Sequence, residues 1–150
     1  MHRIRPALIL GLGMVLTACG PGNGEASADL PSDADPRTIT ATLSDDMAIQ
    51  LSESESEFEV GETVRFEITN AGAIPHEFYV GDAEAQEHHA EEMAEMGGMG
   101  HDEPDGVAVE PGATETFEYT FEQAGEILAG CREPGHYEAG MVTSMTVAGE

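Results

Sequence analysis

The sequence contains no lysine and no tryptophan, and its 150 residues carry 5 arginines against 30 acidic residues. The formal net charge is −25 with histidines neutral. Nucleic-acid binding relies on lysine and arginine contacts to phosphates, so this composition argues against a nucleic-acid partner. It also argues against adsorption to anionic lipid by charge. The acidic surface has two interpretations: it steers basic partners toward the protein, or it is a solvated surface typical of a protein that works at high salt.

Long apolar runs are also missing. The run near the N-terminus, Ala7–Leu16, is too short to span a bilayer, and Arg3 and Arg5 precede it, which is the pattern of a signal peptide. The following letters LTAC resemble a bacterial lipobox, which implies removal of residues 1–18 and lipidation of Cys19. An ordinary secretory peptide with an incidental cysteine is the alternative. We therefore predict an extracytoplasmic protein that is anchored to the cell membrane by its acyl chains.

Cysteine is nearly absent, since the chain has only two. If Cys19 is lipidated, Cys131 remains as a single thiol outside the cytoplasm, where disulfides are normally favoured. A disulfide between the two is the alternative, but Cys19 precedes a linker and would be a poor structural partner. An unpaired cysteine in an exported protein needs an explanation of its own.

The composition of the chain after residue 18 predicts a flexible tether followed by one domain. Residues 19–36 begin with Cys19 and continue with Gly, Pro, Ser and Asp, which is typical of a disordered segment. Residues 37–150 form the predicted domain. Apolar and polar residues alternate in several of its segments, as half-buried antiparallel strands require. These segments are residues 39–43, 64–68 and 117–121, and residues 126–131 and 142–147 are predicted to supply the last two strands. We predict an all-β fold, a Greek-key β-sandwich.

One segment interrupts the strand pattern. Residues 82–106 begin with good helix formers, with Asp82 as a candidate cap and Gly97-Gly98 as a candidate end. The segment is therefore predicted as a short helical insertion, and it is rich in methionine and histidine. Its histidines and methionines include three at helical spacing and two in the glycine-rich stretch that follows. They are His89, Met93, Met96, Met99 and His101.

Four further residues have the chemistry of a metal centre. In the stretch AGCREPGHYEAGM, Cys131, His136 and Met141 follow one another with four residues between each. His76, in NAGAIPHEFYV, follows a turn signal and opens a predicted strand. Thiolate and thioether sulfur suit Cu(I) and imidazole suits Cu(II), whereas methionine is a poor ligand for zinc. The set therefore predicts copper.

The motifs N-x-G-x-x-x-H-E-F and C-x4-H-x4-M resemble those of the cupredoxins, the small blue copper proteins, and the loop spacing is similar to that of rusticyanin and auracyanin. The resemblance covers residues 37–148. It implies one type 1 copper with His76, Cys131 and His136 as equatorial ligands and Met141 as the weak axial ligand. Many small bacterial members have a second histidine directly after the cysteine. Arg132 stands there in this sequence, so that auxiliary donor is missing.

The methionine- and histidine-rich insertion then has two interpretations. It forms a second copper site that holds Cu(I) through some of its sulfur and imidazole donors. Alternatively, its methionines pack on the sandwich as apolar side chains, because methionine readily fills gaps in cores.

Two functions follow from the copper ligands. The mature chain has too few histidines for a trinuclear copper cluster and one cysteine too few for a binuclear centre, so we predict that it is not an enzyme. The first function is a lipid-anchored one-electron carrier, whose partner is a redox protein. The alternative is a copper-handling protein that buffers or delivers copper or confers tolerance, with a copper-trafficking partner. The type 1 ligands favour the first function, and the insertion favours the second.

Overall fold

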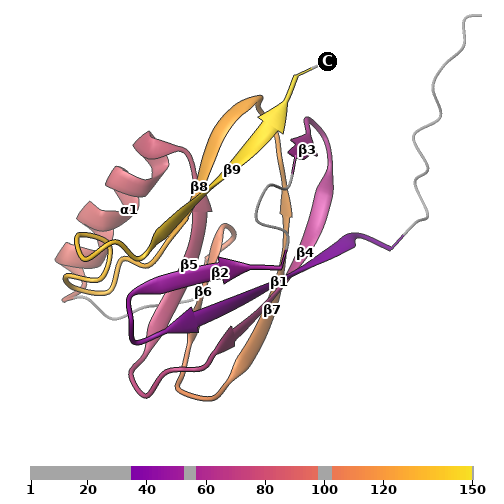
Figure 1. Cartoon of the computed structure of the whole chain (residues 1–150). Helices are drawn as coiled ribbons and strands as arrows, with labels where there is room; N and C mark the ends of the chain where they lie inside the picture. The colour runs from indigo at the N-terminus through magenta and orange to yellow at the C-terminus, as the bar shows by residue number, and fades with distance from the viewer. Residues whose placement is uncertain (1–34, 53–56, 98–102, 150) are drawn as a thin grey trace, which may run out of the picture. The chain divides into compact units, whose positions relative to one another are not determined.

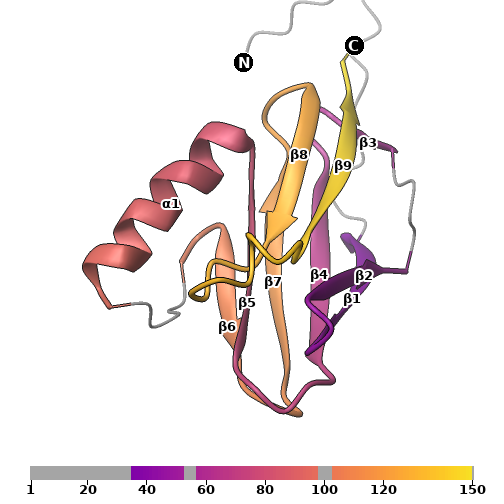
Figure 2. The same ribbon diagram turned by 60° about the vertical axis from the view of Figure 1, so that its left-hand side comes forward.

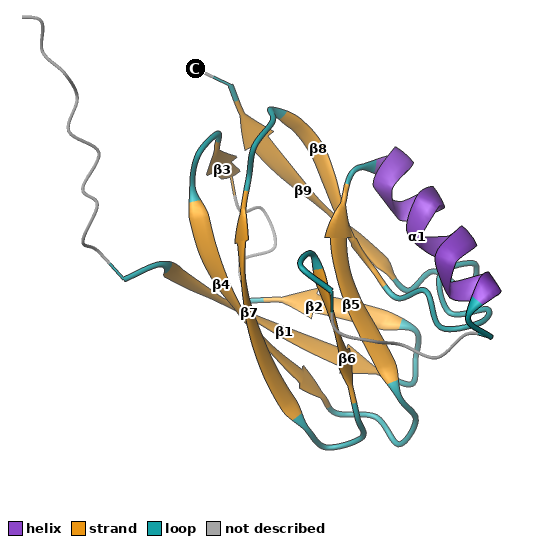
Figure 3. Ribbon diagram, turned by 180° about the vertical axis from the view of Figure 1, so that it is seen from behind, coloured by secondary structure: helices purple, strands orange, loops and turns teal. Residues whose placement is uncertain are grey.

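In the computed structural model, residues 35–52, 57–97 and 103–149 are described, and they form two β-sheets with one helix on the outside (Figure 1). One sheet has the strand order β2-β1-β4-β7 and the other has the order β3-β9-β8-β5-β6. The elements are β1 (Arg37–Ser44), β2 (Ala48–Leu51), β3 (Glu57–Glu59), β4 (Thr63–Asn70), β5 (His76–Gly81), α1 (Ala83–Glu95), β6 (Gly106–Val109), β7 (Thr114–Thr120), β8 (Gly125–Gly130) and β9 (Val142–Ala148). Figure 3 shows the all-β architecture and its single helix from behind. Among these residues, no helix is both long enough and apolar enough to cross a membrane.

The predicted all-β sandwich with a helical insertion is confirmed. All five predicted segments form strands, and in β1 the alternation of polarity buries Ile39, Ala41 and Leu43. The expectation of antiparallel neighbours is wrong for two pairs, because β1 pairs with β4 and β3 pairs with β9 in parallel. Alternation could not reveal this, since successive side chains point to opposite faces in either pairing.

The core between the sheets is built on aromatic side chains. The ring centroids of Phe66 in β4 and Phe78 in β5 lie 5.3 Å apart, and those of Phe58 and Phe121 are stacked at 4.3 Å. All four side chains are buried. Each such burial stabilises the fold by roughly 1.5–3 kcal/mol. Within one sheet β5 and β8 are antiparallel neighbours; His76 opens β5, and Cys131 directly follows β8.

The helix α1 lies against β5 and β8 (Figure 2). Its predicted start is confirmed, because the Asp82 side chain accepts a hydrogen bond from the Ala85 backbone N–H at 2.8 Å. Its predicted end is confirmed at Gly97, whose φ of +80° is the left-handed conformation that commonly ends helices. One face of β5 packs against the other sheet, β2-β1-β4-β7, and the helix covers the opposite face. Every residue of β5 is therefore buried.

Gln86 fastens the helix to the sheet. Its side-chain Nε2 donates hydrogen bonds to the Tyr79 carbonyl of β5 at 3.0 Å and to the Leu128 carbonyl of β8 at 3.2 Å. Gln86 is fully buried. The two bonds fix the position of α1 over the strands that carry the metal ligands.

Candidate metal centre

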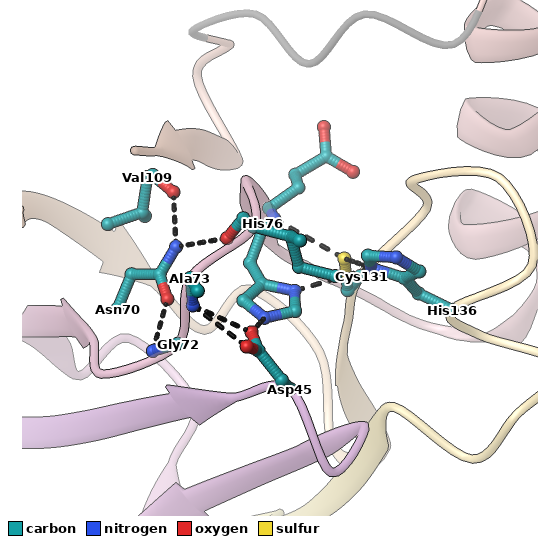
Figure 4. Close-up of polar contacts among 10 residues, drawn as sticks. Asp45, Asn70, Gly72, Ala73, His76, Val109, Cys131 and His136 are labelled. Atoms are coloured by element: carbon teal, nitrogen blue, oxygen red, sulfur yellow. Dashed lines mark hydrogen bonds and ion pairs between the residues drawn. The ribbon is translucent and has the colours of Figure 1, made fainter. Parts of the chain in front are cut away.

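His76 is placed by the turn that precedes β5. The buried side chain of Asn70 donates from Nδ2 to the carbonyls of Ile74 and Val109, both at 2.8 Å, and its Oδ1 accepts from the Gly72 N–H at 2.8 Å (Figure 4). An amide that makes three such bonds holds the turn rigid. His76 therefore enters the sheet at a fixed position.

Asp45 orients the imidazole ring of His76. Its Oδ1 lies 3.3 Å from Nε2 of His76, and its two carboxylate oxygens accept from the Ala73 N–H at 3.0 and 2.8 Å. The other ring nitrogen, Nδ1, lies 3.3 Å from Nδ1 of His136 (Figure 4). Burial lowers the pKa of His76, and this outweighs the opposing contact with Asp45. The lowered pKa favours the neutral form that a metal ligand requires, and Nδ1 is the ring nitrogen on the side of His136.

The loop after β8 brings His136 back toward Cys131. The His136 N–H donates to the Glu133 carbonyl at 3.0 Å, which closes a turn with Pro134 and Gly135 at its centre. Gly135 has a φ of +83°, as the third residue of a type II turn requires. The turn that Pro134-Gly135 predicts is present.

Met141 is tied to the same loop by its backbone. Its N–H donates to the His136 carbonyl at 3.0 Å, and its carbonyl accepts from the Cys131 N–H at 3.1 Å. The Met141 side chain is fully buried. Backbone hydrogen bonds therefore connect all three predicted ligands of this loop.

The thiol of Cys131 is buried and free, so it does not form a disulfide. Its Sγ lies 3.3 Å from Nδ1 of His136, and it accepts a hydrogen bond from the Glu77 N–H at 3.3 Å. Burial raises the pKa of Cys131 to about 11, although the Glu77 N–H acts in the opposite direction. A cation is therefore needed to stabilise the thiolate, and metal binding displaces the thiol proton.

The donor set fits copper. One donor atom each of His76, Cys131 and His136 lies within 4.8 Å of the others, and Met141 supplies a buried thioether on the same loop. Two imidazoles and a thiolate with a weak thioether suit copper in both oxidation states. Copper would be held here by these four residues. A β-sandwich with this site defines a cupredoxin, a type 1 copper protein.

The comparisons with known proteins agree with this class. The model of the copper-binding proteins of the plastocyanin/azurin family matches residues 38–148. The chain belongs to this family, as its motifs predict. A protein from Pseudomonas aeruginosa named copper-resistant cuproprotein CopI is 32% identical, over 97% of this chain and 97% of its own. A protein of the same name from Rubrivivax gelatinosus is 39% identical, over 74% of this chain and 66% of its own.

Two solved structures share the fold. Reduced auracyanin from Roseiflexus castenholzii superposes with a TM-score of 0.63 at 23% identity, over 77% of this chain and 99% of its own. Auracyanin A from Chloroflexus aurantiacus gives a TM-score of 0.58 at 22% identity, over 76% of this chain and 100% of its own.

Arg132 directly follows Cys131, at the position where many small bacterial cupredoxins have a second histidine. Its guanidinium lies 3.4 Å from the centre of the Tyr137 ring, and its Nε donates to Oε1 of Gln86 at 3.2 Å. The residue thus links the ligand loop to α1.

The predicted second copper site is described only in part. Met99 and His101 lie outside the described residues. On α1, His89 and Met93 are buried, whereas Met96 at the helix end is 44% exposed. Burial of Met93 agrees with the packing interpretation of the insertion, and the Cu(I) site remains a prediction.

A buried carboxylate beside the centre was not predicted from the sequence. Glu77 is 1% exposed, and its Oε1 lies 2.9 Å from Nε2 of His89. Its Oε2 accepts from the Arg132 backbone N–H at 3.1 Å. The available signal was a charged residue within the otherwise apolar stretch HEFYV. Glu77 thus joins the copper centre, through its N–H to Cys131, with the helix.

The ring of His89 is held by its hydrogen bond to Glu77 and by an aromatic neighbour. The ring stacks on Tyr79 with centroids 4.0 Å apart. Burial alone would lower the pKa of His89, but its hydrogen bond to Glu77 and the charges of Glu77, Glu103 and Glu92 raise it. A cation at this buried position is therefore favoured by the carboxylates around it.

Proposed function

We propose that the protein binds copper outside the cytoplasm and protects the cell from excess copper. The likeness to copper-resistant cuproproteins, at 32% identity over almost the whole chain, carries this proposal. Bound copper supplies a one-electron Cu(I)/Cu(II) couple. The chain's own part is to enclose the ion, since the side chains of His76, Cys131 and Met141 are fully buried. Such burial keeps copper away from reductants and thiols in solution.

One-electron transfer to a redox protein is the second candidate, and a specific observation favours it. Among the four copper ligands, His136 is partly exposed while the other three are buried. A partly exposed imidazole ligand provides a short path for electron transfer between a partner protein and the copper. In either function the protein is proposed to be a binding protein and not an enzyme, and its partner is a copper-trafficking or redox protein.

Growth on copper separates the two functions. In a strain that lacks its own copy of the gene, the wild-type chain should restore growth at elevated copper. A variant with Cys131→Ser and His136→Ala should fail to restore it, although it reaches the same location in equal amount. Normal tolerance with this variant, together with slower respiratory electron transfer, would contradict the tolerance proposal and support the electron carrier.

We also propose that Cys19 carries the lipid anchor, on the basis of the LTAC motif. Wild-type protein should sediment with membranes, because two or more acyl chains anchor a protein stably. Cys19→Ser should release it or block its processing, because the acyl chains are attached through the cysteine. Membrane fractionation and intact mass measure this. Fully soluble, unmodified wild-type protein in the exporting host would refute the anchor.

A further inference from the structure

We propose that His89, Glu92 and Glu103 form a second metal site for a divalent cation, with Cu(II) as the ion bound most tightly. One donor atom from each residue lies within 4.8 Å of the other two. Nδ1 of His89 lies 3.4 Å from Oε2 of Glu103 and 4.0 Å from Oε2 of Glu92. Two ligand atoms that are each about 2 Å from the same ion are separated by about 3–4 Å. Nδ1 of His89 already has this spacing from both carboxylates.

Glu77 directs the imidazole toward this site. A carboxylate only accepts hydrogen bonds, so Nε2 of His89 carries the proton in its 2.9 Å bond to Glu77. Nδ1 is then the nitrogen that faces Glu92 and Glu103. A metal-binding histidine commonly has a carboxylate on its other ring nitrogen, because this bond fixes the ring and increases its basicity. The stacked ring of Tyr79 keeps His89 in this orientation.

An ion can reach the three donors from solvent. Their side chains range from 1% exposed in His89 to 21% in Glu103 and 46% in Glu92. Glu92 and Glu103, with Glu95 and Met96, also line a surface cavity of about 260 Å³. The two carboxylates are thus open to solvent, and Nδ1 of the buried imidazole lies within 4.0 Å of both.

The chemistry of the donors selects the ion. One imidazole and two carboxylates provide nitrogen and oxygen, which suit divalent ions better than Cu(I), whose preferred ligands are sulfur. Among common divalent ions, Cu(II) binds most tightly to such donors. This site therefore differs from the Cu(I) site expected for the insertion, although both use His89. Its donors are separate from the four ligands of the type 1 centre.

The two sites are connected through one residue. The Glu77 N–H binds Sγ of Cys131 at 3.3 Å, and the Glu77 carboxylate binds His89. A divalent ion on Nδ1 of His89 places positive charge close to this link. Occupation of the second site should therefore shift the visible band of the type 1 centre.

Copper titration of the full-length protein tests the proposal. After one equivalent of Cu(II) has filled the type 1 site, a second equivalent should give a separate paramagnetic resonance signal with coupling to one imidazole nitrogen. Loss of a residue that only supports a ligand weakens metal binding about 10–100-fold, so the double variant Glu92→Gln and Glu103→Gln, which loses two ligands, should bind the second ion still more weakly. Both changes keep the side-chain shape and leave the His89–Glu77 bond in place. The matched control, Glu87→Gln with Glu91→Gln, removes two exposed carboxylates elsewhere on α1 and should bind it as the wild type does.

Three results would overturn the proposal. They are no second ion in the wild type, equal affinity in the double variant, and a second ion lost only when Met96 and Met99 are changed to leucine. The last result would assign the ion to the methionines. The visible band is recorded in the same samples, so a failure of the type 1 assignment appears as a missing band, whatever the second ion does.

Discussion

Replacement of Cys131 by serine should abolish the intense visible absorption of the copper-loaded protein. That absorption comes from charge transfer between the thiolate and Cu(II), and a serine hydroxyl does not supply it. Sγ of Cys131 lies next to Nδ1 of His136 at 3.3 Å and belongs to the cluster with His76. Loss of a residue that only supports a ligand weakens metal binding about 10–100-fold, so loss of the ligand itself should weaken it further.

Two measurements establish the cause of this loss. Absorption of the copper-loaded protein reports the ligand, and copper-dependent stabilisation reports affinity, because a ligand that binds only the folded state raises Tm. Cys131→Ser should keep a wild-type Tm without copper but lose the increase with copper. Cys19→Ser removes the chain's other cysteine and should keep both the band and the increase. A visible band that persists in Cys131→Ser would show that another residue is the thiolate ligand.

The long strands could be predicted because each buries one face. In β4, Val64, Phe66 and Ile68 alternate with more exposed residues, which gives a clear period of two. The strands that sequence analysis missed are β2, β3 and β6, with four, three and four residues. Such short segments contain too few residues for a period to be recognised. They also depend on neighbouring strands for their hydrogen bonds.

The copper ligands could be predicted because three of them lie within one loop. Their types and spacing are local, and His76 has the turn signal of Asn70 and Gly72 in front of it. The contact between Glu77 and His89 could not be predicted in this way. It exists only because α1 packs on β5, which no local pattern specifies. The sequence alone placed His89 on one face of a predicted helix together with Met93 and Met96.

Loss of the Glu77 carboxylate should give the largest loss of stability among single changes near the site. In Glu77→Ala, Nε2 of His89 and the Arg132 N–H both lose their buried acceptor. Breaking a buried pair in this way lowers the free energy of unfolding by about 3–5 kcal/mol. Denaturant titration of the copper-free protein measures it. Glu67→Ala removes an exposed carboxylate from β4 and should change stability by less than about 0.5 kcal/mol.

The pH dependence of this difference identifies its origin. The pKa of His89 in the folded protein is raised above its ordinary value of 6.5, so its contribution to stability is complete below that value. The contribution is lost as the pH rises through the folded pKa. In Glu77→Ala, the hydrogen bond and the charge of Glu77 no longer raise the pKa of His89, so this contribution to stability becomes smaller. The gap in unfolding free energy between wild type and Glu77→Ala should therefore be largest below pH 6.5 and narrow at higher pH. A gap that stays constant across this range would mean that lost packing, and not the Glu77–His89 pair, explains the change.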